Sequence, residues 1–299
     1  MASVAILVFL ICLGFGKLQG AFFTECCIPL GSFSESCFSS VCQHDPKQTN
    51  NTESDGQTVD PHRLEDGERL VLIDTGMGEK QSDKFFSYYY RWGEDTLVSS
   101  LKKHGFHPDD ITDVFLTHLH FDHCGGSVIK TSEGSFETTF KNAKYWSNKD
   151  HWAWAARPNK REGASFLKEN FSPILESGQL NYIEKDVNNY LTESPLGFDV
   201  LFVDGHTEKQ MVPVINYKGQ KIAFAADLVP THGHIPVPYL MSYDVRPLVS
   251  LNEKEKFLNY CCLNDVFLFF EHDAFVELGS LENTDRGVRL NNKLKLSEL

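Results

Sequence analysis

From residue 63 onward, the hydrophobic positions follow two different periods. Short apolar runs rich in β-branched residues predict strands, and longer runs with apolar residues three or four positions apart predict amphipathic helices. We expect strands at residues 69–76, 110–118, 180–184, 198–203 and 266–270, and a hairpin over residues 211–228 that turns at Lys218-Gly219. We expect helices at residues 93–105, 162–171 and 252–261, and another either after Gly126 or near residues 149–156. This alternation predicts an α/β domain.

Five of the apolar runs end at a carboxylate or an imidazole. The residues at these ends are Asp74 after VLI, the His118 cluster after VFL, His206 after VLFVDG, Asp227 after IAFAA and His272 after VFLFFE. A single Asp or His at a strand end is common, but five such ends favour a shared purpose. Strand ends on one rim of a sheet pair converge, so we expect these side chains to contribute to one site.

The second of these runs leads into THLHFDHCGG at residues 117–126, which holds four groups that can bind a metal. Side chains two positions apart in an extended segment point the same way, so His118 and His120 can bind one ion. Asp122 and His123 lie beyond the bend and can bind a second ion. Imidazole with one carboxylate suits zinc, and iron, manganese and cobalt stay open. A solvated turn is the plain alternative, but the buried strand before the loop and the small residues after it favour a metal site.

The first 62 residues differ from the rest of the chain. Residues 3–16 are almost wholly apolar, which is too short for a membrane span and typical of a signal-peptide core, although no Lys or Arg precedes them. Secretion with local disulfides also fits the sequon Asn50-Asn51-Thr52 and four cysteines, Cys26, Cys27, Cys37 and Cys42. The alternative is a buried strand followed by a loop.

These features divide the chain into three parts. We expect a signal peptide at residues 1–20, an atypical Cys-containing segment and linker at residues 21–62, and one folded domain at residues 63–299. The protein is expected to be secreted or extracytoplasmic if the leader is cleaved, and cytoplasmic otherwise.

The composition limits the classes of partner that the protein is expected to bind. The chain has 299 residues, 41% of them hydrophobic, which is enough for a sizeable core. Its formal net charge of −13 argues against nucleic acid, which binds to basic surfaces. We see no long low-complexity tract and no repeat with a solenoid period.

The order of the polar motifs resembles that of the metallo-β-lactamase-fold hydrolases. The matching motifs are DTG at residues 74–76, HxHxDH at residues 118–123, GHT at residues 205–207, Asp227 and His272. DGERLVLIDTGMG and DDITDVFLTHLHFDHCGG are similar to the group of N-acyl-homoserine lactonases and methyl parathion hydrolase. The resemblance runs from about Arg63 to the C-terminus and implies a four-layer αβ/βα sandwich. Residues 1–62 do not resemble the two strands and loop with which this fold usually begins.

The resemblance also implies a dinuclear site with two zinc ions per chain, or other divalent transition metals. The first ion is assigned to His118, His120 and His206. The second is assigned to Asp122, His123 and His272, with Asp227 bridging the two ions. Asp74 is expected to position the histidine loop. Histidine at position 120, where diiron relatives commonly carry glutamate, favours the zinc hydrolases.

The expected chemistry is hydrolysis of a lactone or another carboxylic ester by a hydroxide that bridges the metals. Asp122 is the candidate catalytic residue, because it can pass a proton to the leaving group. Cys124 beside the site is interpreted as a small packed residue. Two alternatives stay open: a phosphotriester or thioester hydrolase on the same site, and a non-catalytic metal-binding homologue.

Substrate contacts are the least specified part. Residues 231–244 follow Asp227 and offer His234, Tyr239 and Tyr243 as pocket candidates. The tyrosine that homoserine lactonases use soon after the bridging aspartate is missing. The aromatic stretch at residues 84–96 is either a lid over an apolar substrate or core packing. The expected partner is a small-molecule ester or lactone, with no nucleic acid and no stable membrane span in the mature chain; a homodimer stays open.

Overall fold

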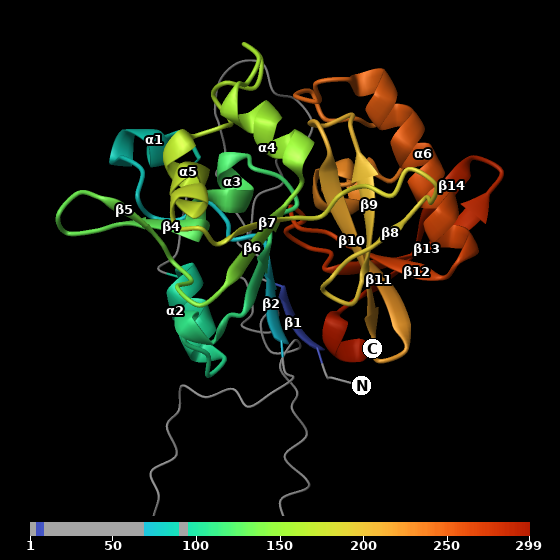
Figure 1. Ribbon diagram of the computed structural model, residues 1–299. Coiled ribbons are helices and arrows are strands. Elements are labelled where there is room, and N and C mark those ends of the chain that lie inside the picture. The colour runs from blue at the N-terminus through green and yellow to red at the C-terminus, as the bar shows by residue number, and fades with distance from the viewer. Residues whose placement is uncertain (1–3, 9–68, 90–94) are drawn as a thin grey trace, which may run out of the picture.

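The computed structural model describes residues 4–8, 69–89 and 95–299 (Figure 1). Its first sheet has five strands in the order β1-β2-β3-β6-β7, and every neighbouring pair in it is parallel. These strands are β1 (Val4–Val8), β2 (Arg69–Ile73), β3 (Asp113–Phe115), β6 (Lys144–Ser147) and β7 (Leu180–Tyr182). In a parallel sheet all strands end at the same edge, so the residues that follow β2 and β3 lie next to each other.

The second sheet has seven strands in the order β14-β13-β12-β11-β10-β9-β8. Only β11 and β12 pair in parallel, and the other neighbours are antiparallel. The strands are β8 (Thr192–Glu193), β9 (Asp199–Val203), β10 (Gln210–Tyr217), β11 (Gln220–Phe224), β12 (Val266–Phe269), β13 (Leu278–Thr284) and β14 (Gly287–Leu294). A separate hairpin is formed by β4 (Val128–Lys130) and β5 (Phe136–Thr138).

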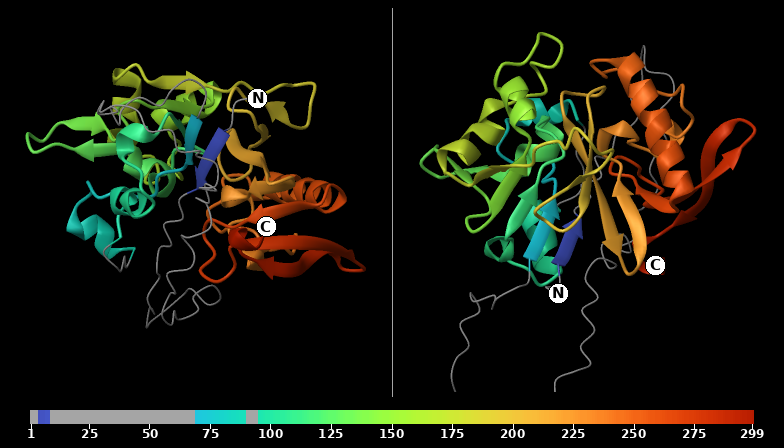
Figure 2. Two further views of the ribbon diagram at one scale, coloured as in Figure 1. Left: turned by 90° about the horizontal axis from the view of Figure 1, so that it is seen from below. Right: turned by 45° about the vertical axis from the view of Figure 1, so that its right-hand side comes forward.

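Helices cover the outer faces of both sheets, which gives the expected four-layer sandwich (Figures 1 and 2). The helices are α1 (Asp83–Ser87), α2 (Leu97–Lys103), α3 (Phe121–Cys124), α4 (Lys149–Ala156), α5 (Lys168–Glu176) and α6 (Pro247–Leu263). Helices α2, α4 and α5 lie on the side of the five-stranded sheet, and α6 covers the seven-stranded sheet. Across the described ranges, no helix is long and apolar enough to cross a membrane.

Successive side chains along a single strand pack in different layers of the sandwich. In β2, Leu70 and Leu72 pack in the cluster that contains residues of α2, α4 and α5, whereas Val71 and Ile73 pack against the inner face of the other sheet. In β9, Val200 and Phe202 face the first sheet, and Leu201 and Val203 pack in the cluster that contains α6 residues. Because successive side chains of a strand point to opposite faces, an apolar run without polar interruptions buries both faces of its sheet.

The apolar leader contributes a strand within the described residues. Strand β1 lies inside the segment expected to be a signal peptide and pairs in parallel with β2 at the edge of the five-stranded sheet. The four N-terminal cysteines and the sequon lie outside the described residues. Cleavage of the leader and a linker at residues 21–62 therefore stay predictions.

Most of the expected elements are present, with two differences. The expected helix at residues 162–171 is wrong in its position, because α5 spans Lys168–Glu176. Residues 159–165 instead form turns, in which the Asn159 side chain accepts from the backbone amides of Arg161 and Glu162. Helix α6 begins five residues before the expected start at residue 252, with Pro247 in its first turn, where a missing amide hydrogen costs nothing.

Candidate metal centre

All five of the singled-out strand ends meet between the two sheets. Strands β2 and β3 bring Asp74 and the histidine loop from one sheet, and β9, β11 and β12 bring His206, Asp227 and His272 from the other. A direct backbone bond joins the two sheets here, since the Met211 amide donates to the Thr117 carbonyl over 2.8 Å. The convergence predicted from the strand ends is confirmed.

The histidine loop is held against the DTG segment by its small residues. The Gly76 strand bridge to Cys124 and a 2.7 Å bond from the Thr75 amide to the His123 carbonyl place the two backbones in contact. A methyl group on Gly125 would lie 2.2 Å from the Met77 carbonyl oxygen. The two glycines after Cys124 are therefore required for close approach of the backbone, as their size suggested.

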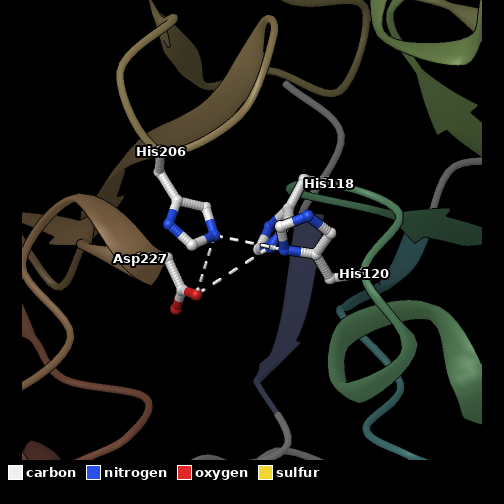
Figure 3. A group of neighbouring side chains, drawn as sticks. All are labelled: His118, His120, His206 and Asp227. Atoms are coloured by element: carbon white, nitrogen blue, oxygen red, sulfur yellow. Dashed lines mark hydrogen bonds and ion pairs between the residues drawn. The ribbon is translucent and has the colours of Figure 1, made fainter. Parts of the chain in front are cut away.

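A first ligand group consists of His118, His120, His206 and Asp227, and all four are buried (Figure 3). The Nδ1 atom of His120 lies 3.0 Å from His118 Nε2 and 3.2 Å from His206 Nε2. Asp227 Oδ2 completes the group at 3.1 Å from His206 Nε2 and 3.9 Å from His118 Nε2. The family resemblance assigned these three imidazoles to one ion, and the structure brings them together.

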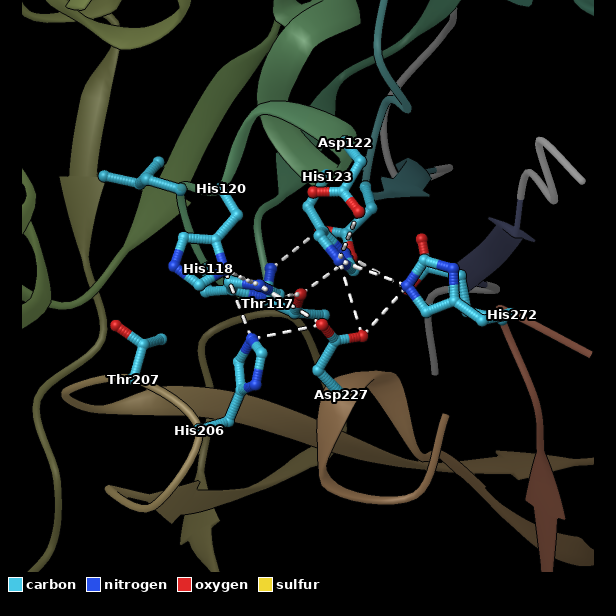
Figure 4. A network of polar contacts seen from close by, with 12 residues as sticks. Thr117, His118, His120, Asp122, His123, His206, Thr207, Asp227 and His272 are labelled. Carbon is cyan, nitrogen blue, oxygen red and sulfur yellow. Dashed lines mark hydrogen bonds and ion pairs between the residues drawn. The ribbon is translucent and has the colours of Figure 1, made fainter. Parts of the chain in front are cut away.

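A second ligand group lies beside the first and shares Asp227 with it (Figure 4). Its other members are His123, Glu271 and His272. Asp227 Oδ1 lies 2.9 Å from His272 Nε2 and 3.5 Å from His123 Nε2, and the two imidazole nitrogens are 3.4 Å apart. The predicted ligand Asp122 stands at the edge of this group, with Oδ2 3.8 Å from His123 Nε2. Its role as a ligand and as a proton carrier stays a prediction.

The nitrogen and oxygen atoms that converge in these groups are better arranged to bind metal ions than to form hydrogen bonds with one another. A neutral imidazole has one N–H donor and one lone pair, so nitrogens that converge at 3.0–3.4 Å cannot all be paired by hydrogen bonds. Asp227 Oδ1 is buried without a hydrogen-bond partner among the described residues. Convergent imidazole lone pairs and a carboxylate are the donor set of zinc and similar divalent ions. The residues present therefore fit two such ions.

Asp227 dominates the charge balance of the site. Burial alone would raise its pKa, but the facing imidazoles His272, His206 and His123 outweigh burial and hold the pKa well below the usual range. Burial likewise opposes protonation of His206 and His272, but the neighbouring carboxylates, Asp227 first among them, raise both pKa values to about 9. The centre thus stabilises positive charge between its imidazoles. Metal cations and protons therefore compete for the same nitrogen and oxygen atoms.

His123 and His206 are oriented from behind by polar partners. Asp74 receives bonds from the Thr117 amide at 2.8 Å and the Thr117 hydroxyl at 2.7 Å, and its Oδ2 lies 3.0 Å from His123 Nδ1. Burial and the neighbouring Glu271 raise the pKa of Asp74 to about 7. His206 Nδ1 faces Asp244 Oδ1 at 3.0 Å. Such partners fix which ring nitrogen is free to bind a metal.

Sequence reasoning missed several of these supporting residues. Glu271 directly precedes His272 at the end of an apolar run, and its Oε2 lies 3.2 Å from His123 Nδ1. His151 is buried in α4, where Nε2 accepts from the Leu119 amide at 2.8 Å. Glu162 lies in a segment whose local pattern gives no hint of the centre. Glu271 and Asp244 carried a usable signal, because Glu271 continues an apolar run that was already singled out and Asp244 ends residues 231–244, which were expected to offer pocket residues.

The three pocket candidates are all at least partly exposed. Tyr243 is 55% exposed, and its ring centroid lies 6.0 Å from that of His206. His234 is half-buried, with Nδ1 2.8 Å from the Thr231 hydroxyl. The Tyr239 residue is 62% exposed, and its backbone carbonyl accepts from the buried Lys254 ammonium group. Tyr243 is therefore the candidate that the structure places nearest the ligands.

Aromatic residues gather on the other side of the loop. The ring of Phe121, between His120 and Asp122, has its centroid 5.3 Å from Phe85 and 4.9 Å from Tyr89. Phe85 and Tyr89 belong to the stretch expected to be a lid or core packing, and both are half-buried. Of the other four aromatics of that stretch, Phe86 is half-buried and Tyr88 is exposed, and those at positions 90 and 92 lie outside the described residues.

Comparison with known proteins gives a consistent result. The family model of the metallo-beta-lactamase superfamily matches residues 62–261. The structure is similar to that of a probable metal-dependent hydrolase from Staphylococcus aureus, with a TM-score of 0.64, 26% identity and coverage of 75% of this chain and 78% of that chain. It is also similar to AidC, a dizinc quorum-quenching lactonase bound to a product, with a TM-score of 0.59, 25% identity and coverage of 76% of each chain.

Among curated proteins, the chain is 33% identical to an N-acyl homoserine lactonase of a Bacillus species over 100 residues. That match covers 29% of this chain and 40% of the relative. The chain thus matches about two fifths of the length of this lactonase.

Proposed function

The chain belongs to the metallo-β-lactamase superfamily, and on that premise we propose that it is a metal-dependent hydrolase of lactones or other carboxylic esters. The observation that carries this proposal is the pair of ligand groups that share Asp227. Two divalent ions bound there, with zinc the first candidate, would supply a Lewis acid and a water molecule of lowered pKa. Support for lactones comes from similarity to proteins named as lactonases, over part of their length.

The chain's own residues would then divide the work. Asp227 faces both groups with different oxygens and so fixes their spacing. Asp122, with 22% of its side chain exposed, stands where it can hold a proton for the leaving alkoxide. The Tyr243 hydroxyl can donate to the oxygen of a substrate carbonyl. The ring group of Phe85, Tyr89 and Phe121 borders the same loop and offers apolar contact to an acyl or aryl group.

A substrate panel tests this proposal. Zinc-loaded protein is assayed with N-acyl homoserine lactones, simple lactones, aryl esters, thioesters and phosphotriesters. We expect turnover of lactones and carboxylic esters, loss of turnover after treatment with a strong chelator, and recovery with zinc or cobalt. Turnover that resists the chelator would contradict the metal role. Preference for phosphotriesters or thioesters would replace the substrate class, and a two-ion protein that is inactive on the whole panel would contradict hydrolysis.

Tyr243→Phe tests substrate contact separately from metal binding. Removal of one hydrogen bond to the reacting carbonyl is expected to lower kcat/KM about tenfold, which corresponds to about 1.4 kcal/mol. The metal content should stay unchanged, since the hydroxyl is not among the candidate ligands. Tyr239→Phe is the matched control, because that residue is exposed to a similar extent, but only Tyr243 has a ring contact with a ligand histidine among the described residues. Equal kinetics in both variants would remove Tyr243 from the pocket.

A further inference from the structure

The buried carboxylate of Glu162 has no role in the ligand groups, yet it stands directly behind one of them. Glu162 is 3% exposed and belongs to the turns between α4 and α5, far in sequence from every ligand. Its Oε2 accepts from the Trp154 indole at 2.8 Å and from the Asn159 amide at 2.5 Å. Its Oε1 accepts from the Thr207 hydroxyl at 2.6 Å. Three donors hold this carboxylate in one orientation.

The orientation of Glu162 matters because of the ring that it faces. His120 turns Nδ1 toward His118 and His206, so Nδ1 is the atom available to a metal. The proton of the neutral ring must then sit on Nε2. His120 Nε2 is buried without a hydrogen-bond partner among the described residues, and Glu162 Oε1 faces it at 3.6 Å. A small movement of either side chain would close this gap to a charge-assisted hydrogen bond.

The turns that carry Glu162 also hold the rest of the His120 segment. The Phe166 ring packs on the His120 ring with 4.7 Å between centroids, and the Ser165 carbonyl accepts from the Phe121 amide at 2.9 Å. The second contact of Oε1 is with Thr207, which directly follows His206 in the chain and lies on the same side of the centre (Figure 4). One carboxylate oxygen therefore reaches both His120 and the neighbour of His206.

We propose that Glu162 is a positioning residue of the first ligand group, which fixes His120 in the tautomer with the proton on Nε2 and ties His120 to the His206 loop through Thr207. This inference rests on the metal centre of the proposed function, but it does not depend on the substrate. This role is consistent with the turn at residue 162, where a helix was expected, because the turn directs the Glu162 side chain toward His120.

Metal titration of the full-length protein tests the proposal. Glu162→Gln keeps the size of the side chain but removes the charge that faces His120 Nε2. We expect one of two zinc equivalents to bind about 10–100-fold more weakly, and the other to change by less than about threefold, in competition with a chromophoric chelator. The visible absorption of the cobalt-loaded variant should change for that one equivalent. Glu277→Gln is the matched control, because Glu277 is also buried but accepts from the Leu296 amide.

Spectroscopy provides a second measurement that does not require a stable variant. Correlation spectra of ring nitrogens in the zinc-loaded wild type should show the His120 proton on Nε2 and shifted downfield by the carboxylate. A proton on Nδ1, no downfield shift, or Glu162→Gln affinities equal to those of Glu277→Gln would overturn the proposal. If the wild type itself binds no metal, the proposed function fails as well, so the two failures are distinguishable.

Discussion

The two ligand groups share one carboxylate but differ in how they are enclosed. The first has three buried imidazoles, backed by Thr117, Glu162 and Asp244. In the second, the side chain of His272 is 21% exposed. The Nδ1 atom of His123 faces two carboxylates, those of Asp74 and Glu271. Closed sites generally hold an ion, whereas open positions admit water and substrate. We therefore predict that the first group would retain its ion more tightly and that the second would exchange its ion more readily with solvent.

Asp227→Ala should have the largest effect, because Asp227 is the residue on which both groups depend. Both zinc equivalents should be lost or greatly weakened, and activity should fall by about 10³-fold, the equivalent of several kcal/mol of transition-state stabilisation. Elemental analysis after dialysis, together with the rate on the best substrate, measures this. Asp244→Ala is the comparison, since Asp244 backs only His206 and should weaken one equivalent. An Asp227→Ala protein with two ions and full activity would refute the shared role.

Asp74→Asn should separate the second group from the first. Asp74 has a left-handed backbone, with φ of 54°, which asparagine tolerates, so the change removes charge without adding strain. We expect one zinc equivalent to weaken about 10–100-fold through poorer orientation of His123. Asp113→Asn in strand β3 is the matched control, because that buried carboxylate binds the Trp146 indole instead. If Asp74→Asn binds both ions as the control does, Glu271 alone is sufficient to orient His123.

His151 contacts the histidine loop at Leu119, between His118 and His120, and we expect its contribution to stability to depend on pH. Burial lowers the pKa of His151 to about 3, below the ordinary value of 6.5. Between these values the unfolded chain binds more protons, so the stabilisation present above about pH 6.5 is lost as the pH falls toward about 3. Below about pH 6, the unfolding free energy of the chelator-treated wild type should fall more steeply than that of His151→Gln, by up to about 1.4 kcal/mol per pH unit.

Urea unfolding between neutral pH and about pH 5 gives this comparison. Because the other imidazoles titrate in both proteins, only the difference between the two slopes reports on His151. Parallel pH profiles would show that the His151 contact with the Leu119 amide does not depend on its neutral form.

The parts of the centre that the sequence predicted are those attached to periodic patterns. The residues after β2, β3, β9, β11 and β12 could be placed together because apolar runs mark strands, and strand ends share an edge. The layers followed from the same runs, since Val71 and Leu72 must face opposite sides of the sheet. Short strands such as β6 and β8 were not predicted, because two to four residues do not establish a period.

The residues that support the ligands were not predicted, and the reason is different. Glu162, His151 and Asp244 reach the centre through tertiary packing of segments that have no motif of their own. Glu162 was expected in a helix because its neighbours favour one, but the Asn159 side chain and three donors to the carboxylate stabilise turns instead. Local preference is a weak guide where buried polar contacts decide the backbone.

Cys124→Ala should have the smallest effect on activity, although the thiol adjoins the histidine loop. The side chain is fully buried, Sγ donates to the Leu119 carbonyl over 3.3 Å, and burial raises the thiol pKa to about 12. A protonated, enclosed thiol is a poor nucleophile, so we expect kcat/KM within about threefold of wild type and a stability loss of about 1 kcal/mol from the weak bond and lost volume. Steady-state kinetics and urea unfolding measure both. Inactivity of a folded Cys124→Ala protein that retains both ions, or a covalent acyl adduct on the wild-type thiol, would replace the metal-dependent mechanism with nucleophilic catalysis by cysteine.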